Sequence, residues 1–171
     1  GQLVDTMNAV TDAEIDALMD EYRAAYDFAS EDTDFIEAVR YQAREEIAMK
    51  KMLDAEGCKA FSNTFQDLYG MRQLPGIASQ HLMAQGYGYG GEGDWKVAAM
   101  VRLMKIMTAG MKDAKGTSML EDYTYNLVPG KEGILEAHML EICPSIADGP
   151  ITIKCQPLSM GNREDPARLV F

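Results

Sequence analysis

The fold is decided by the stretch Gly86-Tyr87-Gly88-Tyr89-Gly90-Gly91-Glu92-Gly93-Asp94-Trp95, which separates two segments of helical character. The earlier segment spans residues 75–86 and opens with a proline, which is accepted in the first turn of a helix. Asp94 is a good N-terminal cap for a second helix over residues 95–111. Residues 87–91 are therefore predicted to form a strand or turn between two helices, an arrangement typical of α/β folds.

The same stretch matches the pattern G-x-G-x-x-G over residues 86–91. We interpret the match as coincidental, because a dinucleotide fingerprint follows a strand, opens a helix and leads to a second strand. Here a helix comes first and one long helix follows, so a nucleotide-binding module is only a minor alternative. We expect the glycines to let the backbone turn tightly under a ligand.

Two more helices and a short strand are predicted upstream of this stretch. Thr11 and Glu14 have the spacing of a capping box, and apolar residues recur behind them at helical intervals. A second helix is predicted over residues 34–56, where Gly57 ends it. Residues 58–64 are compactly apolar at their start, which indicates a short strand.

Downstream of residue 116 the sequence changes from helical to β character. Strands are predicted over residues 120–127, 134–140, 151–158 and 167–171. We therefore predict a first domain of the α/β class over residues 1–116 and the start of a β-rich domain over residues 117–171. The helix over residues 95–111 is apolar on nearly every side, so we predict that it is buried between layers.

The composition is that of an ordinary globular protein, and it disfavours several classes of function. The 171 residues carry a formal charge of −11, which repels phosphate and so argues against nucleic acid as a partner. No apolar run reaches the ~18 residues of a membrane span, so no membrane partner is predicted. The 3 cysteines form no C-x-x-C pair, which favours reduced thiols in a cytoplasmic protein.

Three short segments each offer one residue that binds divalent cations well: Glu92, Glu121 and His138. Two carboxylates and an imidazole suit a cation of the Mn²⁺ type, which accepts oxygen and nitrogen donors together. Glu92 lies between two glycines, which indicates that its backbone is crowded against something. Glu121 lies in an apolar and aromatic strand, and a buried acid must be paired or bind a metal.

Each of these residues also has an ordinary structural explanation. An acid just before a helix offsets the helix dipole, which would account for Glu92. Glu121 and Tyr123 share one face of their predicted strand, and that face could simply be exposed to solvent. A histidine in an apolar strand, such as His138, is more often a satisfied core residue than a ligand.

Two further residues complete the candidate set. His81 lies on the helix over residues 75–86, and we predict that it is a surface residue. Phe65 follows the strand over residues 58–64, and α/β proteins place ligand loops at such strand ends. The alternative for Phe65 is ordinary packing in the core.

Taken together, these segments resemble L-arabinose isomerase along essentially the whole chain. The matching segments are residues 1–6, 73–76, 86–88, 91–95, 121–125, 138–141 and 165–169. The family is much longer than this chain, so the resemblance implies a piece from its middle. That piece comprises most of a Rossmann-like central α/β domain of the fucose/arabinose isomerase type, followed by the first strands of a β-rich C-terminal domain.

The resemblance also implies a chemistry, the interconversion of L-arabinose and L-ribulose by a cytoplasmic homo-oligomer. The family's Mn²⁺ site uses two glutamates and two histidines. By motif, Glu92, Glu121 and His138 correspond to three of these ligands, and the fourth, a downstream histidine, lies outside this chain. The resemblance gives Glu92 and Glu121 the catalytic role of moving a proton between carbon atoms of the sugar. Phe65 and Tyr123 match positions near the sugar.

Two other functions stay open. A sugar-binding α/β module without chemistry would keep the aromatic and glycine-rich surface but would not need three metal ligands. An isomerase of a related aldose would keep all of these residues, because sugar preference depends on the shape of the pocket. For either isomerase we predict that the chain alone is inactive, since it lacks one metal ligand and the N-terminal domain that the resemblance implies.

Overall fold

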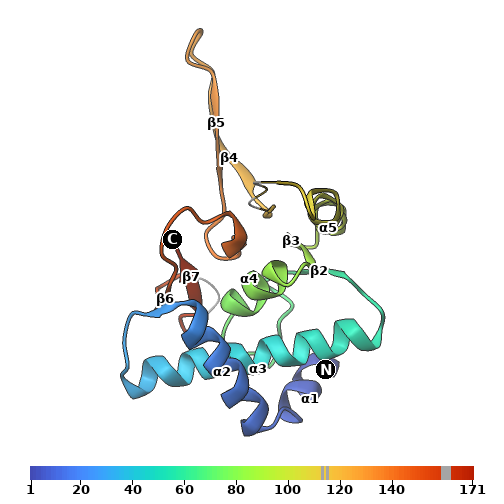
Figure 1. Cartoon of the computed structure of the whole chain (residues 1–171), viewed down its shortest axis with the longest axis vertical. Helices are drawn as coiled ribbons and strands as arrows, with labels where there is room; N and C mark the ends of the chain where they lie inside the picture. The colour runs from blue at the N-terminus through green and yellow to red at the C-terminus, as the bar shows by residue number, and fades with distance from the viewer. Residues whose placement is uncertain (113, 115, 159–162) are drawn as a thin grey trace.

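The computed structural model describes residues 1–112, 114, 116–158 and 163–171 (Figure 1). Among these residues the helices are α1 (Gln2–Asn8), α2 (Asp12–Ala25), α3 (Thr33–Ala55), α4 (Gly76–Ala84), α5 (Trp95–Thr108) and the short η1 (Pro144–Ile146). The strands are β1 (Asp27–Phe28), β2 (Ala60–Asn63), β3 (Gly88–Gly91), β4 (Glu121–Asn126), β5 (Gly133–Ala137), β6 (Thr152–Cys155) and β7 (Ala167–Val170). They form a sheet in the order β1-β6-β7, a parallel pair β2-β3 and an antiparallel pair β4-β5. The predicted α/β fold class is confirmed.

The predicted helices of the N-terminal half are confirmed together with the contacts that start them. The side-chain oxygen of Thr11 accepts a hydrogen bond from the backbone N–H of Glu14 at 3.3 Å, and the Glu14 carboxylate accepts one from the backbone N–H of Thr11 at 2.9 Å. Asp32 caps α3 by accepting from the N–H of Phe35. Gly57 follows α3 with a φ of 68°, the left-handed conformation that glycine adopts readily.

The main hydrophobic core lies where α1, α2 and α3 pack together and against β6 and β7. Its largest fully buried side chains include Ile15, Tyr22, Ile77 and Ile153. A second, smaller core lies under α5 and contains Met83, Tyr89, Val101, Met119 and Cys143. Helix α4 contributes to both cores, so it connects the helical part of the molecule to the part that holds β2, β3 and α5 (Figure 1).

The glycine-rich stretch forms β3 and its junction with α5. Ala60 pairs with Gly88 and Asn63 pairs with Gly91, and α4 connects the two strands. A Cβ atom on Gly88 would lie 2.1 Å from the carbonyl oxygen of Ala98 in α5. This glycine therefore lets α5 pack directly on β3, which differs from the tight turn under a ligand predicted from the sequence.

The prediction that the helix over residues 95–111 is buried between layers is wrong. Only one face of α5 is buried, through Ala98 and Val101. Trp95 is 69% exposed and Met107 is 62% exposed. An α-helix directs side chains around its whole circumference, and one narrow pair of strands covers only one side of it. No other element of the described residues buries the remaining side.

His81 is not the surface residue predicted from the sequence. Its side chain is 15% exposed, and its ring makes edge contacts with Tyr22 and Tyr26. Its Nδ1 atom lies 2.8 Å from the buried carboxylate of Glu46, which also accepts a hydrogen bond from the hydroxyl of Tyr22. Burial acts to lower the pKa of His81, but the hydrogen bond and charge of Glu46 outweigh it and raise the pKa. Helical spacing does not reveal that α3 packs against this side of α4.

Strands β4 and β5 form a hairpin that extends away from the body of the molecule (Figure 1). The pairing register shifts between Asp122 and Thr124, so Tyr123 is an extra residue in β4. Such a bulge breaks the alternation of side chains between the two faces. The regular alternation predicted from Glu121 to Tyr125 is therefore not kept.

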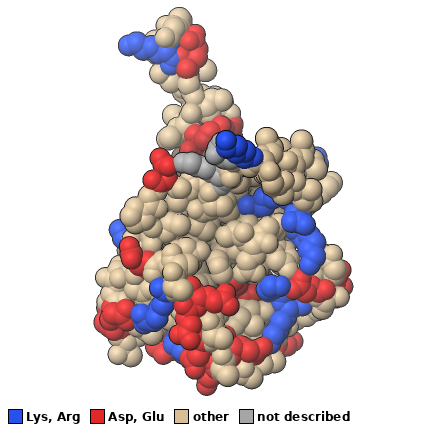
Figure 2. Space-filling model, in the orientation of Figure 1, with Lys and Arg blue, Asp and Glu red and all other residues tan. Residues whose placement is uncertain are grey.

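Charged side chains are unevenly distributed over the surface. On the face in Figure 2 they gather over the helical part and at the tip of the hairpin, and both signs are interspersed there. Charged side chains of both signs also lie at the base of the hairpin, whereas much of the surface between that base and the helical part is uncharged in this view. None of the helices in the described part of the chain is both long enough and apolar enough to cross a membrane.

Candidate active site

A cavity of about 110 Å³ lies at the carboxyl ends of β2 and β3, beside the base of the hairpin and residues 138–141. The five site residues predicted from the sequence all line it: Phe65, Glu92, Glu121, Tyr123 and His138. The carboxyl ends of parallel strands are where α/β proteins bind ligands. The fold thus brings together segments that are far apart in the sequence.

Glu92 has an unusual backbone conformation at the edge of this cavity. Its φ is 56°, and every other positive φ among the described residues belongs to a glycine. The turn from β3 into α5 continues at Gly93 with a φ of 90°, and Asp94 then caps α5 by accepting hydrogen bonds from two backbone N–H groups. A left-handed residue with a side chain costs ~1–2 kcal/mol. Strain of this kind is typical of functional sites.

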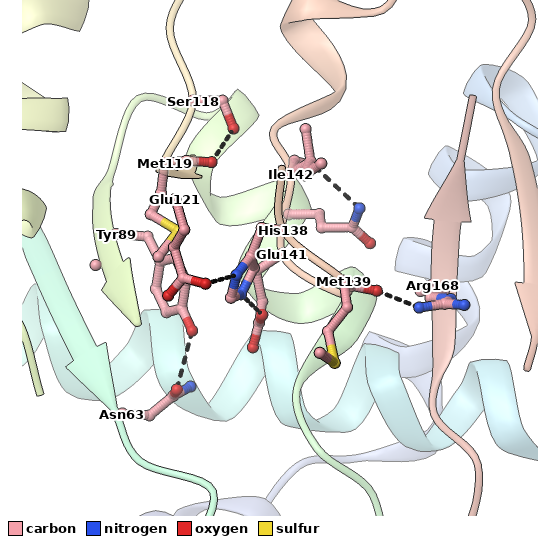
Figure 3. A network of polar contacts seen from close by, with 12 residues as sticks. Asn63, Tyr89, Ser118, Met119, Glu121, His138, Met139, Glu141, Ile142 and Arg168 are labelled. Carbon is pink, nitrogen blue, oxygen red and sulfur yellow. Dashed lines mark hydrogen bonds and ion pairs between the residues drawn. The ribbon is translucent and has the colours of Figure 1, made fainter. Parts of the chain in front are cut away.

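His138 lies between two carboxylates (Figure 3). Its Nε2 atom is 2.5 Å from an oxygen of Glu141, and its Nδ1 atom is 3.3 Å from an oxygen of Glu121. Burial acts to lower the pKa of His138, but the hydrogen bond and charge of Glu141, helped by Glu121, outweigh it and raise the pKa. An ionised carboxylate only accepts hydrogen bonds, so both neighbours favour the protonated ring, with hydrogen on both nitrogens; when the ring is neutral, the shorter contact with Glu141 favours the hydrogen on Nε2. In the neutral ring Nδ1 then presents its lone pair.

Two residues of this cavity have a buried polar atom without a hydrogen-bond partner among the described residues. These atoms are Nδ1 of His138 and Nδ2 of Asn63. Tyr89 donates its hydroxyl hydrogen to Oδ1 of Asn63 at 3.0 Å, which orients the amide and leaves Nδ2 unpaired. An unpaired buried polar group costs ~1–3 kcal/mol. Two of them at one cavity indicate that it is built for a polar ligand.

The same side chains offer donors that suit a divalent cation. Nδ1 of His138 and the carboxylate of Glu121 are neighbours, and Glu92 lines the same cavity. However, within the described ranges no group of three or more His, Cys, Asp or Glu side chains is arranged so that it could hold a metal ion. The contact from Glu141 is the kind that orients an imidazole ligand of a metal. The structure therefore brings two of the three predicted ligands together.

Three residues of this cavity were missed by sequence reasoning: Asn63, Tyr89 and Glu141. Glu141 follows His138 by three positions in an apolar segment, and that spacing is the signal that could have found it. Burial, followed by the charge of Glu141, raises the pKa of Tyr89 well above its usual range, so its hydroxyl keeps its hydrogen. Asn63 offered no signal, because its environment depends on the neighbouring strand.

Comparison with known proteins accounts for this combination of motifs. The family model of the L-arabinose isomerase central domain matches residues 1–110, and the model of the L-arabinose isomerase C-terminal domain matches residues 116–171. The chain belongs to the L-arabinose isomerase family. The resemblance predicted from the motifs is confirmed, while the domain boundary placed after residue 116 stays a prediction.

Individual L-arabinose isomerases match the chain from end to end. The enzyme of Shouchella clausii (strain KSM-K16) is 53% identical over 171 residues, which are 100% of this chain and 34% of that relative. Those of Clavibacter sepedonicus and Geobacillus stearothermophilus are each 52% identical, over 99% and 100% of this chain and 34% of each relative. The chain therefore spans about a third of the length of the curated L-arabinose isomerases it matches.

The cavity draws on both matched domains of the L-arabinose isomerase family. Phe65 and Glu92 come from the central-domain match, whereas Glu121, Tyr123 and His138 come from the C-terminal match. The candidate site thus lies between the two domains. The domains have to be held in one relative position for these side chains to meet.

Proposed function

We propose that this chain belongs to an enzyme that interconverts L-arabinose and L-ribulose. The observation that carries the proposal is the single cavity where the three motifs meet, beside the unpaired polar atoms of His138 and Asn63. A sugar presents hydroxyl and carbonyl oxygens, which are suitable partners for such atoms. The proposal includes Mn²⁺ as the cofactor, a homo-oligomeric assembly and a cytoplasmic location.

In this proposal Glu121 and His138, which are already neighbours, would hold Mn²⁺ together with Glu92, which lines the same cavity. A histidine that the family supplies from outside this chain completes the site. When bound, the cation would supply positive charge that stabilises negative charge developing on the sugar oxygens. Glu141 keeps the ring of His138 in the orientation that this requires.

Glu92 and Glu121 are the proposed catalytic residues. Isomerisation of the aldose moves a hydrogen from C2 to C1 and a proton from O2 to O1, and a carboxylate is able to take the proton from C2 and return it to C1 through an ene-diol. A carboxylate held by a cation is a weaker base, so direct hydride transfer is the competing mechanism. Isomerisation in deuterium oxide separates the two. Deuterium at C1 of L-ribulose supports proton transfer, and complete retention of the substrate hydrogen supports hydride transfer.

Phe65 and Tyr123 are proposed to contact the sugar. Phe65 is half-buried and Tyr123 is half-exposed, and both line the cavity. Ligand pockets are lined mainly by apolar and aromatic side chains, with a few polar groups that fix orientation. The bulge at Tyr123 fits this role, because bulges near active sites change the direction of a side chain.

The decisive experiment replaces the matching third of the Shouchella clausii L-arabinose isomerase with this chain, to which it is 53% identical. The hybrid is expected to form L-ribulose when Mn²⁺ is present. Glu121→Gln in the hybrid should lower kcat by roughly 10²–10⁴-fold, the usual contribution of a positioned acid or base. Glu132→Gln, which changes an exposed acid of the hairpin, is the matched control and should leave kcat unchanged.

Either of two results would contradict the proposal. A correctly folded hybrid that binds L-arabinose but forms no L-ribulose would favour a sugar-binding module without chemistry. Full activity of the Glu121→Gln hybrid would remove the catalytic assignment of that residue. The isolated chain of 171 residues is expected to be inactive, and the test for that expectation is an assay of L-ribulose formation.

A further inference from the structure

The segment over residues 138–143, which carries two residues of the candidate site, has no helix or strand of its own. A backbone without regular secondary structure must find its hydrogen-bond partners elsewhere. Three side chains bond to it: Gln80 to the carbonyl of Ile142, Arg168 to the carbonyl of Met139 and Ser118 to the N–H of Cys143. The position of the site therefore depends on these side chains.

Gln80 on α4 is the fully buried member of this group. Its Nε2 atom donates to the carbonyl oxygens of Ile142 at 2.9 Å and of Leu169 at 3.0 Å. Its Oε1 atom accepts from the backbone N–H of Leu169 at 2.8 Å. The amide of Gln80 thus both donates to and accepts from the backbone of Leu169, as a residue of a neighbouring strand would. It does so on the edge of β7 that does not face β6.

The third bond of this amide connects β7 and α4 to the candidate site. Ile142 directly follows Glu141, whose carboxylate holds Nε2 of His138 at 2.5 Å (Figure 3). Gln80 and His138 also line one groove beside β7. If the carbonyl of Ile142 moved, Glu141 would move with it. Nδ1 of His138 would then lose its position 3.3 Å from Glu121.

We propose that Gln80 is a positioning residue of this site, which sets the place of the His138 ring through Ile142 and Glu141. The inference rests on the proposed function, in which His138 is a metal ligand. The residue type fits the task, because a carboxamide combines two N–H donors with an acceptor. Of the two side chains with this group, only glutamine is long enough to reach both Ile142 and Leu169 from α4.

Gln73 provides a matched control, because it is equally buried and bonds to the same strand. Its Oε1 atom accepts from the N–H of Ala167 at 3.3 Å, and its Nε2 atom donates to the carbonyl of Ala38 at 3.3 Å. No hydrogen bond in the described part of the chain joins it to residues 138–143. Replacing either glutamine with methionine leaves buried partners unpaired, so both variants should weaken the fold.

The test records the imidazole nitrogens of His138 by NMR in the ¹⁵N-labelled, metal-free chain at one fixed pH, chosen above the raised pKa so that the ring is neutral, and His138→Gln identifies its signals. The parent chain is expected to show one tautomer, with hydrogen on Nε2. Gln80→Met is expected to give a mixture of tautomers, whereas Gln73→Met keeps the parental pattern. An unchanged pattern in Gln80→Met, or the same change in both variants, overturns the proposal.

Mn²⁺ binding measured by EPR provides a second readout. Gln80→Met should weaken binding roughly 10- to 100-fold, as outer-shell changes do, and Gln73→Met should stay within about twofold. If the parent chain binds no Mn²⁺, the same measurement in the hybrid enzyme, which supplies the outside histidine, decides the metal part of the proposed function, while the His138 spectra still decide the role of Gln80. If Gln80→Met does not fold, Gln80→Asn replaces it, because its shorter amide cannot reach both carbonyls.

Discussion

Isoleucine has opposite environments in two regions of this molecule. In the helical part, formed by α1 to α4 with β6 and β7, Ile77 and Ile153 are completely buried. In α5 and in the β4-β5 hairpin, Ile106 and Ile134 are 54% and 55% exposed. The candidate active site lies at the base of the hairpin, and it takes residues from β2, β3, β4 and the segment after β5.

The difference shows where the described residues obtain their stability. Burial of apolar surface contributes roughly 25 cal/mol per Å², so side chains in the helical core contribute far more than those that stay exposed. The helical part also pairs many of its buried polar groups, such as the amides of Gln42 and Gln80. Large exposed apolar surfaces are typical of regions that associate with other surfaces. We therefore expect substitutions to have unequal effects in the two regions.

The largest contrast is expected between two isoleucine truncations. Ile153→Ala should lower the free energy of unfolding by about 3–4 kcal/mol, because it leaves a cavity in the main core. Ile106→Ala on the exposed face of α5 should change it by less than about 0.5 kcal/mol. Urea denaturation followed by circular dichroism measures both. Equal losses would show that the two regions do not differ as described.

A second contrast concerns the contact between α5 and β3. Gly88→Ala should cost about 2–3 kcal/mol, because the new Cβ would lie 2.1 Å from the carbonyl oxygen of Ala98 and would displace the helix. Gly133→Ala in the hairpin is the control, since nothing lies within 4 Å of its added Cβ. The same denaturation experiment applies, and a neutral Gly88→Ala would mean that α5 does not pack as closely on β3.

Glu92 offers a smaller effect of the opposite sign. Glu92→Gly should raise the stability by about 1 kcal/mol, because glycine adopts the φ of 56° without the strain of a side chain. It should also weaken Mn²⁺ binding if Glu92 is a ligand. Glu92→Ala loses the same carboxylate but keeps the strained backbone, so it should weaken binding without stabilising the fold. If Glu92→Gly and Glu92→Ala both raised the stability, the cause would be the lost negative charge and not the relief of backbone strain.

The smallest expected effect depends on pH and belongs to the helical part. The pKa of His81 is raised above 6.5 by Glu46 in spite of burial, so folding favours the protonated ring. This contribution to stability is fully present below pH 6.5 and is lost as the pH rises through the raised pKa. Urea denaturation at pH values below and above that range should show that the free energy of unfolding decreases as the pH rises. The decrease should be smaller in His81→Gln. The same decrease in the free energy of unfolding with pH in His81→Gln would contradict the prediction.

Residues that act on their close neighbours in the chain made much of the fold predictable. The capping box of Thr11 and Glu14 and the cap at Asp94 each act within one helical turn, and the helices start where these residues place them. The environments of α5 and His81 could not be predicted in this way. They depend on which element packs against a given helix face, and the periodicity of one helix does not contain that information.

Some residues of the candidate site could be predicted from local motifs, and others could not. The motifs around Glu92, Glu121 and His138 pointed to one site, and the structure places all three at one cavity, although their roles stay predictions. Asn63 and Gln80 could not be found from the sequence, because each acquires its role from a distant partner. Asn63 is oriented by Tyr89 on the next strand, and Gln80 bonds to a residue 62 positions later.

By itself, the sequence determined most of the longer helices and strands to within about three residues, the family and the residues from which a metal and sugar site would be built, whereas α1 and β1 were not predicted. These properties depend on short motifs, whose chemistry is set by neighbours within a few positions. Only the tertiary structure decided which faces are buried, how Glu141 and Glu121 flank His138, and which buried amide connects α4 to that segment. Such contacts join residues that are far apart in the chain, and packing alone brings them together.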